Sequence, residues 1–341
     1  MPSSSEPGPS VWTRPSVWTR RGLVLEPRPS LSWSKQYCMT PTPELRPGGR
    51  LRVYYGTTDA DTIGHISWVD LDATDPLRVL DRAAEPALGP GEPGAFDDCG
   101  VIPSCVLDLA GEKRLYTMGF QRLIRIPYTI FSGLATSADG GQRFARVSTA
   151  PILDRTDAEQ TLRSGPFVLH EGGRFRMWFN AATEWHRLST GKLVPSYGLR
   201  YGESEDGIHW TTYPEPLIVP EDADEIAFAR PWVVRTGEML RMWFSVRKRR
   251  GSDAIGYDRI GYAESTDGRR WRRRDEVLGL GRGTGWDSDM ICYPAVIQVA
   301  GKYLMFYNGN QHGHGGFGVA ECPVERLLAA GLDCSEAAPE L

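Results

Sequence analysis

Two aspartates stand at the same distance before a proline in distant parts of the chain. Asp98 lies five residues before Pro103, and Asp289 lies five residues before Pro294. If these segments are copies of one structural unit, both carboxylates should approach the same central site. Paired carboxylates, one protonated and one ionised, are the groups that acid/base cleavage of a glycosidic bond requires. We therefore predict Asp98 and Asp289 as catalytic residues, with Glu184 as a third candidate from a neighbouring loop.

Other polar and aromatic side chains are predicted to lie near these carboxylates, in segments that reach the same end of the fold. Arginine binds carboxylate or phosphate groups through two parallel hydrogen bonds, and tryptophan stacks on sugar faces. Two alternatives stay open: the arginines pair with the nearby aspartates, and the tryptophans pack in the core. The predicted substrate-binding residues are Asp97, Arg155, Arg163, Trp185, Arg230, Arg247, Trp286, Asp287, Tyr293, Asn310 and His312.

A repeat must position these residues. Prolines recur at intervals of 60, 63, 65 and 63 residues, and an aromatic residue follows each proline after 11 to 13 residues. Each interval is long enough for one four-stranded sheet, so the period predicts an all-β fold, a five-bladed β-propeller. The prolines are Pro43, Pro103, Pro166, Pro231 and Pro294, and the aromatic residues are Tyr54, Tyr116, Trp178, Trp243 and Phe306.

The repeat also sets the expected boundaries. The blades are predicted at about residues 38–90, 96–155, 161–220, 225–280 and 286–322. Residues 22–27 have strand character and are predicted to supply the outer strand of the last blade, which closes the ring and removes exposed edges. Residues 1–20 are predicted as a disordered tail, residues 21–325 as the propeller, and residues 326–341 as a C-terminal helix or tail.

The motif Ser-x-Asp-Gly-x-x-Trp occurs at residues 204–210 and 265–271, with a looser copy at 137–144. It resembles a catalytic motif, but it falls in the hairpin between the third and fourth strands of a blade. Asp-Gly is common turn chemistry, so we interpret these aspartates as structural.

The composition of the chain argues against several classes of function. The chain has 341 residues, a net charge of −4 and 40% apolar residues, without a long apolar run or a secretory signal. These features argue against a nucleic-acid or membrane role and favour a cytoplasmic protein with a small-molecule partner. The six cysteines are scattered, so no zinc site, disulfide framework or cofactor is predicted, although a structural cation in the central channel stays open. They are Cys38, Cys99, Cys105, Cys292, Cys322 and Cys334.

Several segments together resemble a known group, the uncharacterised glycoside-hydrolase-like five-bladed propellers. This group is related in architecture to glycosidase families 43, 32, 68 and 130. The resemblance covers about residues 40–322 and implies that the axial carboxylates are Asp98 and Asp289. The segments that carry it are 96–103, 259–271, 274–275, 279–280, 285–288, 293–294, 307–310 and 316–320.

Two departures from family 43 argue against copying its mechanism. Residues 38–40 replace the usual aspartate of the first blade, and Arg163-Ser164-Gly165-Pro166 replaces the Glu-Gly-Pro that carries the general acid. We expect an intracellular carbohydrate-active enzyme that acts on a glycosidic or glycosyl-phosphate bond of a small, anionic glycoside. A biosynthetic lyase, cyclase or isomerase that reuses the pocket, and a non-catalytic sugar- or anion-binding propeller, are the alternatives.

Overall fold

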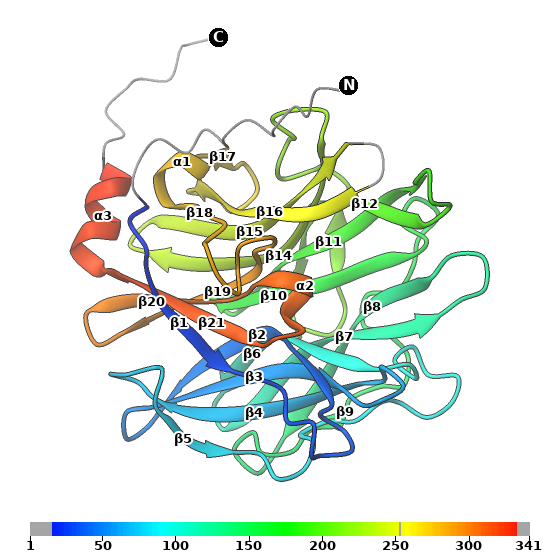
Figure 1. The fold of residues 1–341 in the computed structure, drawn as a ribbon, viewed down its shortest axis with the longest axis horizontal. Coiled ribbons are helices and arrows are strands. Elements are labelled where there is room, and N and C mark those ends of the chain that lie inside the picture. Colours follow the sequence, from blue (N-terminus) through cyan, green and yellow to red (C-terminus); the bar gives the residue numbers. More distant parts are fainter. Residues whose placement is uncertain (1–15, 252–253, 333–341) are drawn as a thin grey trace, which may run out of the picture.

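The computed structural model describes residues 16–251 and 254–332, and in these residues the fold is nearly all β (Figure 1). Antiparallel strands form five successive groups. Group 1 contains β2 (Gln36–Arg46), β3 (Arg50–Thr58), β4 (Gly64–Asp72) and β5 (Val79–Arg82). Group 2 contains β6 (Val101–Leu109), β7 (Glu112–Arg122), β8 (Tyr128–Ser137) and β9 (Ala145–Arg146). Group 3 contains β10 (Leu162–Glu171), β11 (Arg174–Arg187), β12 (Leu193–Ser204) and β13 (Thr211–Tyr213).

The last two groups are less regular. Group 4 contains β14 (Glu225–Thr236), β15 (Met239–Arg250), β16 (Ala254–Ser265), β17 (Arg272–Arg273) and β18 (Leu280–Gly281), and the last two both pair with β16. Group 5 contains β19 (Cys292–Val299), β20 (Lys302–Asn308), β21 (Phe317–Pro323) and the N-terminal strand β1 (Thr19–Leu25). The helices are short: α1 (Asp275–Leu278), the irregular turn α2 (Asn310–Gly313) and α3 (Val324–Leu332).

The two ends of the described chain meet in group 5. Strand β1 pairs antiparallel with β21, so it is the outer strand of the last group (Figure 1). It begins at Thr19, and Trp18 before it is buried, so the folded part starts earlier than the predicted boundary at residue 21. Helix α3 lies where a C-terminal helix was predicted, while residues 1–15 and 333–341 of the predicted tails lie outside the described residues.

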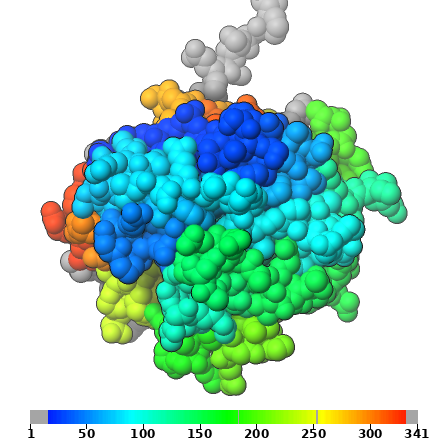
Figure 2. Space-filling view, turned by 90° about the horizontal axis from the view of Figure 1, so that it is seen from below, coloured from blue at the N-terminus to red at the C-terminus, as the bar shows by residue number. Residues whose placement is uncertain are grey.

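Neighbouring groups are joined through their first strands. Short parallel pairings connect β8 to β10 and β12 to β14, and Gly64 forms a parallel bridge to Gly100. The first strands also contact one another in a circuit from β2 through β6, β10, β14 and β19 back to β2. Figure 2 shows groups 1 to 3, in blue, cyan and green, packed into one continuous surface. The first strands therefore line the centre of the fold.

Strand pairing corrects the register of the predicted repeat. The residue that faces the second-strand aromatic residue is Ala295 in group 5, opposite Phe306, and Thr42 in group 1, opposite Tyr54. Pro294 comes directly before Ala295, so its counterpart is Pro41, directly before Thr42, rather than Pro43. In group 2, Cys105 faces Tyr116, which puts Ser104 at the proline position. The equal spacing of prolines was therefore off by two residues in group 1 and by one in group 2.

Each first strand has a bulge just before the residue that faces the second-strand aromatic residue. In groups 1, 4 and 5 this bulge also links neighbouring groups. The residue before the proline has a positive φ at Thr40 (50°), Arg230 (49°) and Tyr293 (58°). Its N–H donates to a side chain on the second strand of the preceding group, which satisfies a backbone donor that the bulge removes from the strand ladder. The donor–acceptor pairs are Thr40 to Asn308 (2.8 Å), Arg230 to Asn180 (2.9 Å) and Tyr293 to Ser245 (2.8 Å).

The opposite end of the fold confirms the interpretation of the Ser-x-Asp-Gly motif. Each aspartate accepts backbone N–H groups of its own turn, as Asp206 Oδ1 does from Ile208 and His209. The second-strand aromatic residue of the preceding group donates to a glycine carbonyl of the turn. These bonds are Tyr54 to Gly141 (3.0 Å), Tyr116 to Gly207 (3.1 Å) and Trp178 to Gly268 (2.8 Å). The aspartates are therefore structural.

Arg230 fills the centre of the circuit. Its side chain is completely buried, and Nη1 donates to the carbonyls of Tyr293 (3.0 Å) and Pro294 (3.3 Å). Nη2 donates to the carbonyl of Pro41 (2.9 Å) and to Thr42 Oγ1 (2.8 Å), with longer bonds to Thr40 O and Ser104 O. Burial lowers the pKa of Arg230 to about 9, so the side chain stays charged at neutral pH. This guanidinium links group 4 to groups 1, 2 and 5.

We predict that Arg230→Met lowers the free energy of unfolding by about 3–5 kcal/mol, because it leaves several buried carbonyls without a donor. The measurement is urea denaturation of the full chain followed by tryptophan fluorescence. Arg270→Met is the matched control, since the Arg270 side chain is 93% exposed. An equal, small change in both variants would contradict a central structural role for Arg230.

Candidate functional site

Asp97 and Asp287, rather than Asp98 and Asp289, occupy equivalent positions. Asp97 lies five residues before Ile102, and Asp287 lies five residues before Cys292, the matching positions of β6 and β19. Both are buried, and each accepts from the Nε of an outer-strand arginine at 2.8 Å: Arg146 on β9 for Asp97 and Arg20 on β1 for Asp287. Through these ion pairs, Asp97 connects the loop before β6 to the outer strand β9, and Asp287 connects the loop before β19 to the outer strand β1. The Oδ1 atom of Asp97 is buried without a hydrogen bond, and burial raises the pKa of this carboxyl, so a role of Asp97 in substrate binding stays a prediction, as it does for Asp287.

Asp98 keeps one carboxylate oxygen without a partner. Oδ2 accepts from the N–H of Gly94 (2.9 Å), while Oδ1 is buried and has no hydrogen bond. The residue is half-buried and precedes β6, at the end where β7 turns into β8. A carboxylate oxygen that is buried but unpaired is suited to exchange a proton with a bound molecule.

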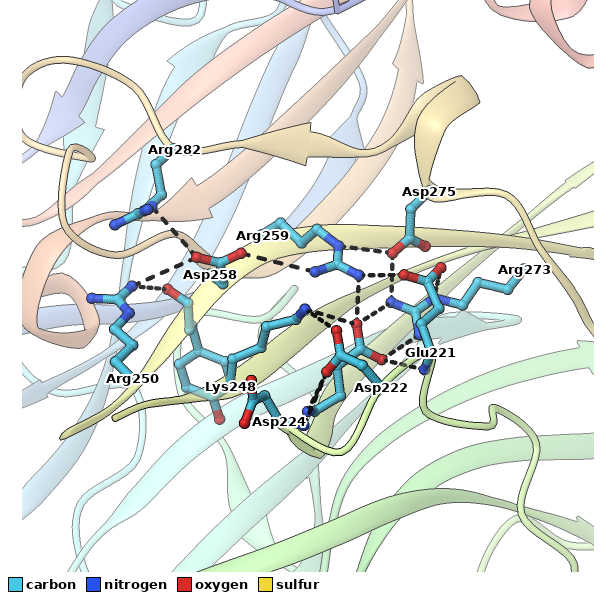
Figure 3. A network of polar contacts seen from close by, with 12 residues as sticks. Glu221, Asp222, Asp224, Lys248, Arg250, Asp258, Arg259, Arg273, Asp275 and Arg282 are labelled. Atoms are coloured by element: carbon cyan, nitrogen blue, oxygen red, sulfur yellow. Dashed lines mark hydrogen bonds and ion pairs between the residues drawn. The ribbon is translucent and has the colours of Figure 1, made fainter. Parts of the chain in front are cut away.

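Asp289 is exposed and belongs to a surface ion-pair system. Its side chain is 69% exposed, and Oδ1 accepts from Arg250 Nη1 at 3.0 Å. Arg250 also approaches Asp258, which pairs in turn with Arg282 and Arg259 (Figure 3). Asp98 and Asp289 therefore differ in burial and partners, and they are not matched members of one buried pair.

The same network uses the acidic residues that enter group 4. Arg259 lies between Asp275 Oδ2 (3.0 Å from Nε) and the fully buried carboxylate of Glu225, and Arg273 bonds both acids at 2.6 Å (Figure 3). Every arginine in this network has a carboxylate partner. These ion pairs fix group 4 and use the carboxylates of Glu225, Asp258 and Asp275.

Glu184 lies on β11 near the β11–β12 turn, and its side chain is 66% exposed. Oε1 is 3.1 Å from His186 Nε2. Both residues line a cavity of about 390 Å³ between groups 3 and 4, together with Arg200, Arg249 and Tyr197. Glu184 is therefore accessible to solvent.

Several other predicted binding residues belong to the scaffold. Arg163 is buried and bonds Glu159, Asp154 O and Thr212 Oγ1, and Arg155 is exposed beside Asp154 and the Phe131 ring. Arg230 donates from both terminal nitrogens to protein acceptors, although its Nε has none. Substrate contacts by Arg163 and Arg230 stay predictions, and most of the donors of these two arginines already have protein acceptors.

The loop before β19 contacts two more of the predicted binding residues, Trp286 within it and Asn310 after β20. Trp286 stacks on Tyr307 with ring centres 5.0 Å apart, and its carbonyl accepts from the N–H of Asn310. Asn310 Oδ1 accepts from the N–H groups of Asp289 and Met290. Both residues fix this loop, although they also line a shallow pocket of about 200 Å³.

Four of the predicted residues do come together, around Arg247. This arginine lies on β15 with its guanidinium carbon 5.7 Å from the Tyr257 ring centre and 6.0 Å from that of Tyr197. Tyr293 and His312 join through Tyr257, whose ring centre is 5.5 Å from Tyr293 and 5.6 Å from His312. We call Arg247, Tyr128, Trp185, Tyr197, Tyr257, Tyr293 and His312 the arginine–tyrosine cluster.

The Arg247 guanidinium is short of acceptors. Within the described residues it has one long hydrogen bond, from Nη1 to Pro195 O (3.4 Å), and no ion pair, and its buried Nε has no partner. Burial raises the pKa of Tyr128 to about 12 and those of Tyr257 and Tyr293 well above their usual value. These phenols are therefore neutral and do not balance the charge. A half-buried cation without a counter-ion is costly, so the cluster is suited to bind an anion.

Sequence reasoning missed two members of this cluster, Tyr197 and Tyr257. Their hydroxyls are 2.5 Å apart, and they lie 60 residues apart near the starts of the third strands of groups 3 and 4. Tyr128 begins the third strand of group 2, and its ring packs on Trp185 at 5.8 Å. The signal was a tyrosine near the start of successive third strands, at about the repeat period.

No metal centre is evident in the described part of the chain. Among residues 16–251 and 254–332, no three His, Cys, Asp or Glu side chains gather so as to hold a metal ion. The five cysteines in these ranges are free thiols. None of the helices in these ranges has the length and apolar character needed to cross a bilayer.

Comparison with known proteins identifies a family. The uncharacterized protein Rv1502 of Mycobacterium tuberculosis is 34% identical over 301 residues, which cover 88% of this chain and 97% of that protein. The chain belongs to the same family as Rv1502. A search of protein-family models found no match.

Solved structures agree on the fold of this family. A glycosyl hydrolase from Bacteroides ovatus superposes with a TM-score of 0.68 at 13% identity, covering 90% of this chain and 94% of that one. A structure reported for the GH130 family of mannoside phosphorylases, which contains glycoside hydrolases that target β-1,2-mannosidic linkages, gives 0.66 at 14% identity over 90% and 94%. The resemblance to glycoside-hydrolase-like proteins is confirmed for the fold.

We predict that His312 makes stability depend on pH. Burial, Arg247 and Lys192 lower the pKa of His312 to about 4, so the folded state keeps it neutral below pH 6.5 while the unfolded state takes up a proton. The free energy of unfolding should therefore fall as pH falls from about 6.5 to 4, by up to about 3 kcal/mol from this residue.

His312→Gln should remove most of that dependence, measured by urea denaturation at pH 7 and pH 4.5. His314→Gln, at an exposed histidine two residues away, is the control and should behave like the unmodified protein. The same loss of stability on acidification in all three proteins would show that His312 is not held neutral.

Proposed function

We propose that the protein is a carbohydrate-active enzyme that cleaves or transfers at a glycosidic or glycosyl-phosphate bond of a small, anionic glycoside. We further propose that the five strand groups are the blades of a closed five-bladed propeller, with β1 completing the last blade. The substrate would bind at the end of the fold that carries the arginine–tyrosine cluster.

The observation that carries this proposal is the unpaired Arg247 guanidinium. Arg230 shows what the fold does with a buried arginine that is purely structural: all its terminal nitrogens have acceptors. Arg247 differs at its terminal nitrogens: within the described residues they make one long hydrogen bond, to Pro195 O, and no ion pair, and neutral phenols lie around them. A carboxylate or phosphate on the substrate would supply both the missing charge and the missing acceptors.

The aromatic members of the cluster support a sugar as the group that carries this charge. Trp185 and Tyr128 meet edge to face, and Trp185 Nε1 is held by Thr161 Oγ1 (3.1 Å), so both rings have fixed positions. Rigid aromatic rings beside hydrogen-bonding phenols provide the apolar faces and donors that sugars require.

Asp98 is the proposed acid/base residue. In this role it would donate a proton to the leaving oxygen of the glycoside while water or phosphate adds to the anomeric carbon, and it would then accept a proton from the attacking group. The free, buried Oδ1 supports this assignment. Asp289 and Glu184 remain proposed second carboxylates. Substrate binding would have to break the contacts that these exposed side chains make with Arg250 and His186.

A second candidate function is a lyase, cyclase or isomerase. The bulge positions at the centre carry no carboxylate: residues 40, 103, 165, 230 and 293 are Thr, Pro, Gly, Arg and Tyr. The hydrogen-bonded phenols of Tyr197 and Tyr257 lie beside Arg247 and could move a proton without a second acid. Reaction in water enriched in oxygen-18 separates these functions, because only hydrolysis puts solvent oxygen into the product.

We predict that Asp98→Asn lowers kcat by at least about 100-fold on whichever 4-nitrophenyl glycoside or glycosyl phosphate a screen identifies as a substrate, because a general acid contributes at least that factor. Asp139→Asn is the matched control, since Asp139 accepts turn amides at the opposite end of the fold. Unchanged kcat in Asp98→Asn, with thermal stability preserved, would exclude Asp98 as the acid/base.

We predict that Arg247→Gln raises KM at least about 10-fold for an anionic substrate and leaves KM for its neutral methyl ester nearly unchanged, because a charge-assisted bidentate contact is worth at least that factor. Steady-state kinetics on both substrates give the comparison. Equal effects on the charged and neutral substrates would show that Arg247 does not bind the anion. Calorimetric binding without any turnover would favour a non-catalytic binding protein.

A further inference from the structure

A second cavity lies beside the arginine–tyrosine cluster, between groups 1 and 2. It has a volume of about 260 Å³, and the side chains of β2, β6 and β7 line it with the β7–β8 turn. Most of its wall is carbon. The apolar contributors are Met39, Ile102, Phe120, Pro127 and the ring of Tyr128.

The polar groups in this wall are already used within the protein. Thr58 Oγ1 donates to Gln36 O, and Arg122 Nη2 donates to Thr62 Oγ1 and to Asp61 O. The Cys99 thiol accepts from the N–H of Arg122. Apart from the exposed Arg122, whose other nitrogens remain available, the wall offers few side-chain donors or acceptors to hold water or a sugar hydroxyl, so the cavity favours an apolar occupant.

Two glycines set the wall of the cavity. A Cβ at Gly100 would lie 2.3 Å from Gly64 N, and a Cβ at Gly64 would lie 3.0 Å from Val101 N. The two backbones meet here in the parallel bridge between groups 1 and 2. This part of the wall is therefore made of close-packed backbone and keeps its shape.

Tyr128 connects the cavity to the cluster. Its ring lines the cavity and also packs against Trp185. Trp185 pairs across the β11–β12 ladder with Pro195, and the Pro195 carbonyl accepts from Arg247 Nη1 (3.4 Å), so Tyr128 lies beside the cluster. A ligand bound at Arg247 would therefore have an apolar compartment on the far side of one shared side chain.

We propose that this cavity is a subsite for an apolar aglycone, an aromatic ring or a branched alkyl group, carried by the same ligand whose anionic part binds Arg247. The inference rests on the proposed function for the anionic part alone. The ligand class is thus an amphipathic glycoside, with a charged sugar at one end and a hydrocarbon group at the other. Burial of one ring in such a cavity favours binding by about 10- to 100-fold.

The first experiment tests the cavity without any charged group. Binding of fluorobenzene to the full chain is measured by fluorine-19 NMR. Met39→Trp and Phe120→Trp fill the space from two half-buried positions in its wall, and each should weaken binding at least 10-fold. Val219→Trp is the control, at a residue that is 70% exposed, and should bind as the unmodified protein does.

Fluorobenzene that fails to bind, or that binds equally to both cavity-filling variants, would overturn the inference. Two variants are used so that misfolding of one, detected by circular dichroism, leaves the other as the test. Arg247→Gln should bind fluorobenzene normally, because the cavity does not depend on the charge.

The second experiment tests the connection to Arg247 with phenylalkanoates that have two to six methylene groups. One length should bind at least 10-fold more tightly than the alkanoate without the ring, and Met39→Trp should abolish this preference. Arg247→Gln should weaken all of these acids. If fluorobenzene binds but no acid depends on Arg247, the proposed anion site fails and the apolar subsite stands; if no chain length shows a ring preference, the connection between them is wrong.

Discussion

The buried guanidinium of Arg230 is the interaction on which the rest of the fold depends. It places a positive charge at the centre of five strand groups and surrounds it with carbonyl oxygens from groups 1, 2 and 5, and no carboxylate of residues 16–251 or 254–332 forms an ion pair with it. Those carbonyls belong to bulges that would otherwise leave buried acceptors unpaired. Because one side chain satisfies several strands at once, the first strands must converge, and the loops before them must gather at one end.

Between neighbouring groups, too, single side chains satisfy backbone groups of the bulges. Asn180, Ser245 and Asn308 each satisfy the N–H of a bulge in the next group. In group 2 the bulge position is Pro103, which has no N–H to satisfy, and the facing residue on β3 is a glycine at position 56. Group 3 departs from this pattern, because its bulge residue Gly165 has an N–H and the residue at the matching position of β7 is Met118.

Arg247 departs from this pattern, and that departure locates the site. The terminal nitrogens of Arg230, Arg259 and Arg273 have several acceptors, whereas those of the half-buried Arg247 have one long hydrogen bond and lie among neutral rings. Because other arginines of the described chain, among them Arg230 and Arg273, also have an unpaired Nε, the terminal nitrogens are what set Arg247 apart. The glycosidase-like fold favours sugar chemistry, and Arg247 is the side chain that locates the proposed site.

The sequence by itself determined the repeat, the nearly all-β fold, the N-terminal strand of the last group and the structural role of the Ser-x-Asp-Gly turns. These follow from local turn chemistry and from the period of the chain, which need no long-range information. It also identified Arg247, Trp185, Tyr293 and His312, which the fold then brought together.

Only the tertiary structure decided which charged groups are free. Spacing from a proline suggested that Asp98 and Asp289 are equivalent, but the strand register shifts by one residue and makes Asp97 and Asp287 the matched pair. Arg230 and Arg247 look alike in sequence, and the difference between a central structural cation and an open anion site lies in which acceptors surround each one. Partners that are 52 to 190 residues away supply those acceptors, so no local pattern in the chain could reveal them.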